Sequence, residues 1–267
     1  MPQTASPSTP ELVHALRACG SVFAEDEAAL LVEAAAGDPM RLSELLGRRV
    51  TGIPLEQLLG WAEFAGLRVG VEPGVFVPRR RTELLAELAI AACSPDAVIV
   101  DMCCGSGAIG AAVLAAVPTA RLWASDVTAA SVRCARRNLG DRATVVQGDL
   151  FAALPGTLRG GIDILAVNAP YVPSASIARM PPEARLHEPH SALDGGLDGL
   201  DVHRRVAADA GTWLRSGATL LIEASAEQAP ASAALFEAEG FATLIASDDS
   251  RDATVVVARR SAEGGPS

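Results

Sequence analysis

The chain has 267 residues, 49% of them hydrophobic, which predicts one medium-sized domain, or one domain with a small appendage, and enough apolar side chains for a core. The formal net charge of −10 argues against a nucleic-acid partner, since such proteins normally present a basic face. Asp101 and several glycines interrupt the longest apolar run, so no membrane span of roughly 18 residues is expected. The start of the chain has neither a basic region nor an apolar core, so no signal peptide is expected.

Residues 9–59 are expected to form a small helical N-terminal domain, because their apolar residues recur at steps of three and four. Each helical piece opens at a Thr-Pro, acidic or Asp-Pro start and closes near a glycine, as helices commonly do. The Pro-, Ser- and Gly-rich ends, 1–10 and 261–267, are expected to fray.

Residues 60–81 are expected to form a β-hairpin linker. An alternating pattern runs through four apolar residues, Phe64, Leu67, Val69 and Val71. A Glu-Pro-Gly turn at 72–74 follows, and the chain is expected to return through Val75 and Val77.

Residues 82–260 alternate between strand and helix patterns, which predicts an α/β fold with a mostly parallel sheet covered on both faces. The expected strands are 97–101, 121–126, 143–147, 162–168, 218–224, 241–247 and 253–260. The expected helices are 82–93, 107–117, 128–139, 197–215 and 226–239. Only a short connection joins the last two strands, so they are expected to pair as an antiparallel hairpin at the far end of the sheet.

A glycine-rich turn, "DMCCGSGAIG", follows the first strand of this sheet, and its Gly105, Gly107 and Gly110 fit the GxGxxG pattern of dinucleotide sites. Asp101 ends that strand and is expected to point into the same crevice, where a pyrophosphate would add two negative charges. S-adenosylmethionine carries a sulfonium and an ammonium and no phosphate. The turn therefore favours S-adenosylmethionine over NAD as the cofactor.

Acidic residues end the next two strands as well. Asp126 is placed to accept hydrogen bonds from ribose hydroxyls, as the acid of dinucleotide folds does. Asp149 is placed to accept from the adenine amino group, with Leu150 beside the ring. The alternative is that Asp126 and Asp149 only cap helices. Three consecutive strand ends that each carry an acid favour the cofactor.

The five cysteines have no metal-ligand spacing, and the four histidines form no HExxH pair, so no metal site is expected. An odd set of thiols suits a cytoplasmic location. The adjacent Cys103 and Cys104 would close only a strained disulfide. They are interpreted instead as small residues that let the backbone approach the cofactor.

The segment "NAPY" ends the fourth strand of the sheet, where open α/β folds bind ligands. A planar NH2 group is a poor nucleophile, and two acceptors that grip its hydrogens raise the electron density on nitrogen and aim it. The Asn168 side-chain oxygen and the Ala169 carbonyl are suited to this role, since Pro170 keeps Ala169 extended. Tyr171 offers a flat face to the acceptor. The alternative is a strand-ending proline turn with a buried asparagine.

These motifs resemble the HemK/PrmC-type protein-(glutamine-N5) methyltransferases, a class I S-adenosylmethionine-dependent family that methylates glutamine in peptide chain release factors. The resemblance spans residues 50–258. It rests on four segments, "GIPLEQLLGWAEFAGLRVGVEPGVFVPRRRTELL", "DMCCGSGAIG", "VNAPY" and "EPHSALDGGLDGLD".

The resemblance implies a Rossmann-like class I sheet with an antiparallel last strand, and a helical N-terminal domain that grips the protein substrate. It implies cofactor contacts at Cys103, Cys104, Gly105, Ser106 and Gly107, with Asp126 and Leu150 beside adenosine. It also implies that Asn168, Ala169, Pro170 and Tyr171 hold the glutamine, with Asn168 next to the cofactor.

Three departures mark a divergent member of this family. Cys103 stands where the family usually has a glycine, and Ala169 replaces the first proline of N-P-P-Y. Ala253 stands where the family often has an arginine. The protein substrate is accordingly left open, with a release factor as one candidate.

Two other classes of function remain. Adenine amino-group methyltransferases of nucleic acid use the same N-P-P-Y box, and the three arginines at 79–81 fit that alternative, whereas the acidic charge opposes it. A catalytically silent S-adenosylmethionine-binding module is the second alternative, with Cys103 and Ala169 as the inactivating changes.

Overall fold

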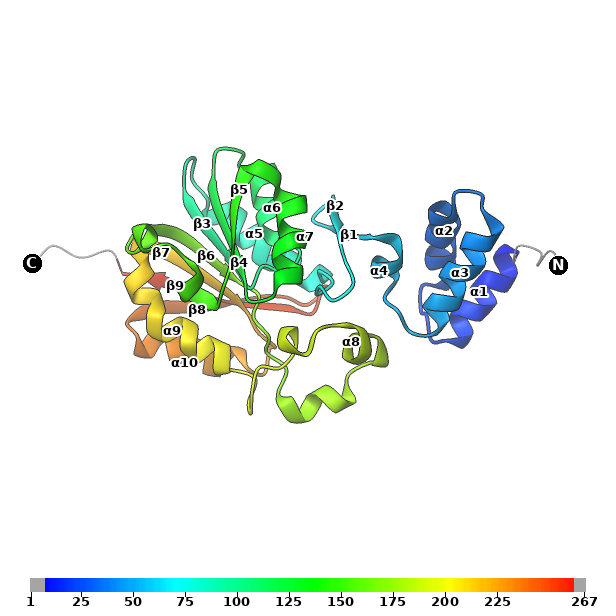
Figure 1. Ribbon diagram of the computed structural model, residues 1–267. Coiled ribbons are helices and arrows are strands. Elements are labelled where there is room, and N and C mark those ends of the chain that lie inside the picture. Colours follow the sequence, from blue (N-terminus) through cyan, green and yellow to red (C-terminus); the bar gives the residue numbers. More distant parts are fainter. Residues whose placement is uncertain (1–7, 262–267) are drawn as a thin grey trace, which may run out of the picture.

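The computed structural model describes residues 8–261 (Figure 1). Most of the ends that the sequence predicts to fray, 1–7 and 262–267, lie outside the described residues. At the N-terminal end α1 begins at Thr9, so the prediction of fraying was wrong for residues 9 and 10.

Helices come first and lie apart from the sheet, to which α4 and the β1–β2 hairpin connect them (Figure 1). They are α1 (Thr9–Ala18), α2 (Ala24–Ala35), α3 (Pro39–Val50) and the short α4 (Leu55–Leu59). Leucines from each of them form a separate core, including Leu12, Leu31 and Leu45. Helix α3 shows how the sequence starts an element: the Asp38 carboxylate accepts from the Met40 N–H at 2.9 Å, and proline opens the first turn.

The hairpin forms one turn earlier than the sequence predicts. Strands β1 (Trp61–Phe64) and β2 (Leu67–Gly70) pair antiparallel, with Phe64 opposite Leu67. The turn residues are therefore Ala65 and Gly66, whose φ angles of 49° and 74° fit a primed two-residue turn that matches strand twist. A turn does form at 72–74, where the Val75 N–H donates to the Glu72 carbonyl at 3.1 Å. The predicted returning strand was wrong, because residues 71–79 form no strand.

The main sheet has seven strands in the order β5-β4-β3-β6-β7-β9-β8. Their bounds are β3 (Val98–Met102), β4 (Arg121–Asp126), β5 (Ala143–Gln147), β6 (Ile162–Val167), β7 (Leu214–Glu223), β8 (Phe241–Asp248) and β9 (Ala253–Arg260). The first five strands in this order run parallel, and β9 pairs antiparallel with both β7 and β8. This confirms the predicted α/β sheet with an antiparallel last strand.

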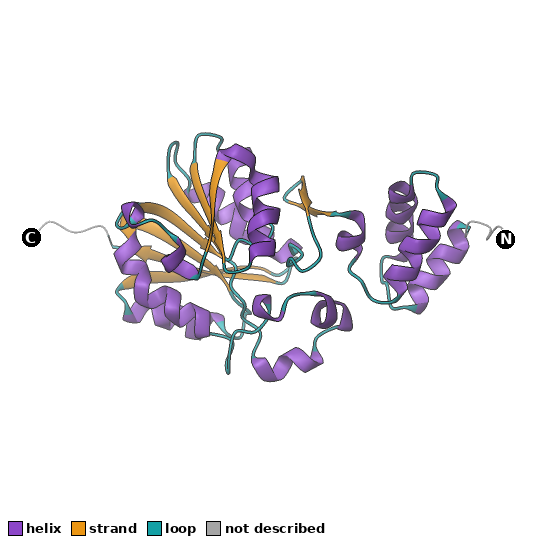
Figure 2. Cartoon of the chain, viewed as in Figure 1, coloured by secondary structure: helices purple, strands orange, loops and turns teal. Residues whose placement is uncertain are grey.

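Helices cover both faces of the sheet (Figure 2). On one face lie α5 (Glu83–Ala92), α6 (Ala108–Ala116) and α7 (Ala129–Leu139), and on the other lie α9 (Asp201–Trp213) and α10 (Ala229–Ala238). All five residues of β3 are buried, which explains why four of them are apolar and Asp101 is the exception. The short α8 (Pro182–His187) belongs to the long loop between β6 and α9.

The corrected turn yields a stability prediction. Because Ala65 adopts a left-handed conformation that Asn tolerates better, Ala65→Asn should increase the free energy of unfolding by about 0.5–1 kcal/mol and so raise the melting temperature. The matched Gly66→Ala should decrease the free energy of unfolding by about 1 kcal/mol, because alanine is strained at this left-handed φ even though its Cβ would meet no atom within 4 Å. Thermal unfolding followed by circular dichroism measures both. A lower melting temperature for Ala65→Asn would place the turn elsewhere.

Candidate active site

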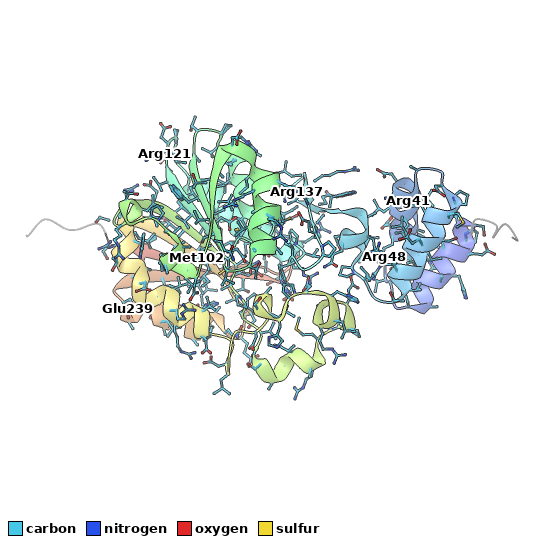
Figure 3. The ribbon with its side chains drawn as sticks, viewed as in Figure 1. Arg41, Arg48, Met102, Arg121, Arg137 and Glu239 are labelled. Atoms are coloured by element: carbon cyan, nitrogen blue, oxygen red, sulfur yellow. The ribbon has the colours of Figure 1, made fainter. Side chains whose placement is uncertain are left out.

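A cavity of about 410 Å³ opens where the parallel strands end. Figure 3 shows the direction of the strands: Arg121, at the start of β4, lies at the outer edge, and Met102, at the end of β3, lies in the middle of the molecule. The segments after β3, β4, β5 and β6 all line the cavity. Parts of 64–82 and 180–194 line it as well, so the linker and the loop around α8 also form its walls.

The glycine turn brings backbone groups to the cavity. Cys103 and Gly105 have left-handed φ angles of 58° and 53°, and both line the cavity together with Cys104 and Ser106. Gly107 does not line the cavity; it is the N-cap residue of α6 and has a left-handed φ of 77°. Gly110 allows close packing, because a Cβ there would lie 2.6 Å from Leu122. The turn thus combines ligand approach with helix–strand contact.

Asp101 lies behind this turn and not in the crevice where the sequence places it. It pairs with Ala124 on one side and Ala166 on the other, in the middle of the sheet, and it is fully buried. Its Oδ2 accepts from the Gly110 N–H at 3.0 Å, and burial raises the pKa of Asp101 to about 8. Asp101 therefore supports the turn from behind, and the expectation that it faces the ligand directly is corrected.

Asp126 and Asp149 do line the cavity, as does Leu150. Asp126 holds the turn in place, since its Oδ2 accepts from the Gly105 N–H at 3.0 Å and its Oδ1 from the Thr128 N–H at 2.9 Å. Asp149 is half exposed and forms an ion pair with Arg205 at 2.6 Å. The first residue of α7 follows Thr128, whose own side chain caps that helix. The capping alternative for Asp126 therefore does not account for its position.

The "NAPY" residues follow β6, the neighbour of β3, and line the cavity as well. The Asn168 Nδ2 donates to the Thr82 Oγ1 at 3.2 Å, and the Tyr171 hydroxyl donates to the Glu223 Oε1 at 3.0 Å. Burial, with the Glu223 charge, raises the pKa of Tyr171 well above its ordinary value, so the phenol stays protonated. Across residues 8–261, no hydrogen bond uses the Asn168 Oδ1 or the Ala169 carbonyl. Both acceptors are therefore available to a ligand.

Sequence reasoning missed two buried carboxylates near this wall. Glu188 lines the cavity and accepts from the Arg79 Nη2 at 2.6 Å, and Glu223 ends β7 beneath Tyr171. An acid at the end of an apolar strand flagged Asp101 and Asp126, and the same signal in "LLIEA" could have found Glu223. Thr82 and Arg81, which line the cavity, also went unassigned, although both stand in the segment that carries the family resemblance.

The cysteines of the turn fit a packing role. Burial raises the pKa of both Cys103 and Cys104, so neither is a thiolate near neutral pH. All five cysteines are free thiols. Within the described residues, no group of three or more His, Cys, Asp or Glu is placed to hold a metal ion. In the same part of the chain, no helix has the length and apolar character needed to cross a membrane.

Comparison with known proteins shows that this chain is similar to methyltransferases. A family model described as "Methyltransferase small domain" matches residues 66–183. The release factor glutamine methyltransferase of Gloeobacter violaceus is 41% identical over 198 residues, 71% of this chain and 68% of that protein. The 4-amino-L-phenylalanine/4-methylamino-L-phenylalanine methyltransferase of Streptomyces pristinaespiralis is 36% identical over 210 residues, covering 76% and 71% of the two chains. A solved methyltransferase from Pyrococcus furiosus matches the fold with a TM-score of 0.55 at 14% identity, over 73% and 90% of the two chains.

The left-handed turn residue yields the second prediction. Cys103→Gly removes a strained φ but adds chain entropy to the unfolded state, so the unfolding free energy should stay within about 1 kcal/mol of the wild type. Cys103→Val, with a β-branched side chain at the same φ, should lose about 1–2 kcal/mol. Chemical denaturation measures both. Equal stability of Cys103→Val and the wild type would show that the turn is not strained.

Proposed function

Because this chain belongs to the release factor glutamine methyltransferase family, we propose that it transfers a methyl group from S-adenosylmethionine to a glutamine side-chain amide in a peptide chain release factor. The identity and coverage of the Gloeobacter relative support family membership. The observation that carries the chemistry is local: two unpaired acceptors, the Asn168 Oδ1 and the Ala169 carbonyl, lie at the wall of the cavity. An NH2 group offers the two hydrogens that these acceptors need.

The donor set of the cavity fits S-adenosylmethionine. Asp126 suits the ribose hydroxyls, the backbone of residues 103–106 suits the amino acid part, and Leu150 with Asp149 suits the adenine. Carboxylates at this end favour a cationic ligand over a pyrophosphate. When bound, S-adenosylmethionine supplies an electrophilic methyl group.

The residues of this chain then bind and orient the acceptor. Asn168 and Ala169 accept hydrogen bonds from the amide NH2, which raises electron density on nitrogen and fixes its direction. Pro170 keeps the Ala169 carbonyl in place, and Tyr171 offers its ring face to the planar amide. The amide nitrogen loses its proton after transfer, so no residue is needed as a general base.

We assign substrate recognition to the N-terminal helical domain, residues 9–59, and methyl transfer to residues 82–260, with 60–81 as linker. An ion-pair cluster supports a mechanical connection between them. Arg49, only 8% exposed, donates to Glu27 in α2 at 2.8 Å and to Glu183 in α8 at 3.3 Å. The helical domain is thereby tied to the loop that carries Glu188 to the cavity.

The alternatives are less well supported. The net charge of −10 opposes an adenine methyltransferase of nucleic acid. Cys103 already adopts the left-handed φ that the turn requires, and the Ala169 carbonyl is retained, so neither change argues for a silent module. The free cysteines fit a cytoplasmic location, where thiols stay reduced.

Asp126→Ala tests the cofactor assignment. The variant loses a charged acceptor for the ribose, so S-adenosylmethionine binding should weaken by about 1.5–3 kcal/mol. Isothermal calorimetry measures the loss, with Asp209→Ala on the outer surface of α9 as a matched acidic control. Tight binding of NAD by the wild type, or unchanged affinity in Asp126→Ala, would contradict the assignment.

Asn168→Ala tests the acceptor assignment. Cofactor affinity should stay nearly unchanged, and the single-turnover rate of methyl transfer to a bacterial release factor should fall on the order of a hundredfold. Ala169→Pro, which restores the family's sequence and keeps the carbonyl, should retain transfer. Free 4-amino-L-phenylalanine serves as the comparison acceptor. A wild-type rate of transfer in Asn168→Ala would mean that residues 168–171 are only a strand-ending turn. Transfer to free 4-amino-L-phenylalanine and not to the release factor would mean that the acceptor is not a protein.

A further inference from the structure

Glu223 is a buried carboxylate with a specific position behind the acceptor wall. It is the last residue of β7, it is 2% exposed, and it does not line the cavity. The Tyr171 hydroxyl donates to its Oε1 at 3.0 Å, and the Arg81 Nε lies 3.5 Å from the same oxygen. Its Oε2 is buried and has no hydrogen-bond partner among residues 8–261, and Thr82 lies close enough to this carboxylate to lower its pKa. A buried carboxylate costs free energy, and filling a core does not require one.

The Asn168 amide can adopt two orientations, and this carboxylate can select one of them. An amide has an acceptor end and a donor end, and rotation by half a turn exchanges them. Methyl transfer needs the oxygen end to face the acceptor NH2. The partner that decides the orientation is the Thr82 Oγ1, 3.2 Å from the Asn168 Nδ2.

A threonine hydroxyl has one proton, and its direction determines the orientation of Asn168. When the proton points to Glu223, the Thr82 oxygen can only accept, so the Asn168 Nδ2 must face it and the Oδ1 faces the cavity. When the proton points to Asn168, the amide oxygen turns toward Thr82 and the cavity receives a donor. An ionised carboxylate beside Thr82 selects the first arrangement, because it accepts hydrogen bonds and donates none.

Residues 223–228, at and after the end of β7, hold Tyr171 by its hydroxyl and by its backbone carbonyl. Glu223 holds the phenol, and the Gln228 Nε2 donates to the Tyr171 carbonyl at 2.9 Å. Gln228 also donates to the Asp198 carbonyl at 2.8 Å. The chain after β7 thus supports the "NAPY" wall from behind without touching the cavity.

We propose that Glu223 is a positioning residue for methyl transfer: by accepting the Thr82 proton, it orients the Asn168 oxygen toward the acceptor amide. This inference rests on the proposed function, since only an acceptor with hydrogens to donate needs the oxygen end. Glu223 itself contacts neither cofactor nor acceptor. It acts through Thr82 and Asn168.

The proposal makes the rate of transfer depend on pH. Burial raises the pKa of Glu223, and hydrogen bonds from Thr82 and Tyr171, with the charges of Arg81 and Arg79, oppose this rise. Arg79 also faces Glu188, and the raised pKa of the Tyr171 phenol keeps that group protonated across the range. As pH falls through the raised pKa, Glu223 gains a proton that it can donate to Thr82, and the orienting effect is lost. Transfer should therefore decline on the acid side.

Glu223→Gln tests this proposal in the full-length protein. The substituted amide can donate to Thr82 and so reverse the orientation of Asn168. With a bacterial release factor as acceptor, the single-turnover rate should fall about tenfold to a hundredfold, and the acid decline of the wild type should disappear. S-adenosylmethionine affinity, measured by calorimetry, should stay within about twofold. Thr219→Val, which removes a buried hydroxyl earlier in the same strand, is the control for a merely structural loss and should keep the acid decline.

A second pair of variants decides the matter if Glu223→Gln does not fold. Thr82→Val removes the hydroxyl, so its transfer should be slow, and Thr82→Ser restores the hydroxyl and should be faster than Thr82→Val. Equal rates in these two variants, or wild-type transfer with an unchanged acid decline in Glu223→Gln, would overturn the inference. If Asn168→Ala is slow in the same assay, the proposed function survives that result. If Asn168→Ala also transfers normally, the proposed function fails with it.

Discussion

The hydrogen bond from the Asn168 Nδ2 to the Thr82 Oγ1 is the interaction on which the acceptor site depends. It joins the end of β6 to the start of α5, two segments that the fold brings together at the carboxyl edge of the sheet. It leaves the Asn168 oxygen and the Ala169 carbonyl as the free acceptors of the wall. The remaining features of the site hold that wall beside the glycine turn: Asp126 fixes the turn, and Glu223 and Gln228 support the wall.

Much of this arrangement could be predicted from the sequence. The alternation of strands and helices in 82–260 predicts the parallel sheet, and a parallel sheet brings its strand ends to one edge. Residues after strands therefore meet there whatever their distance in sequence, which is why Asp126, Leu150 and Asn168 could be placed together. The short connection between β8 and β9 predicted their antiparallel pairing.

Other features depend on information that a linear pattern does not carry. Asp101 was predicted to face the cavity because it stands near the end of a strand. Side chains alternate between the two faces of a sheet, and the sequence pattern does not show which of them are covered; the Asp101 side chain is buried. The hairpin was placed too late because Pro73 and Gly74 form a stronger turn signal than Ala65 and Gly66, while the pairing of Phe64 with Leu67 decides the outcome. Thr82 and Glu223 lie far apart in the sequence, so their contact with the "NAPY" residues appears only in the folded chain.

The most direct test of the central claim is a crystal structure of the protein with the demethylated cofactor and a release-factor peptide that contains the acceptor glutamine. The account predicts that the glutamine nitrogen lies about 2.7–3.2 Å from both the Asn168 Oδ1 and the Ala169 carbonyl. Thr82 should remain the partner of the Asn168 Nδ2 in that complex. A glutamine nitrogen that contacts neither acceptor, or an Asn168 oxygen that turns toward Thr82, would contradict the account.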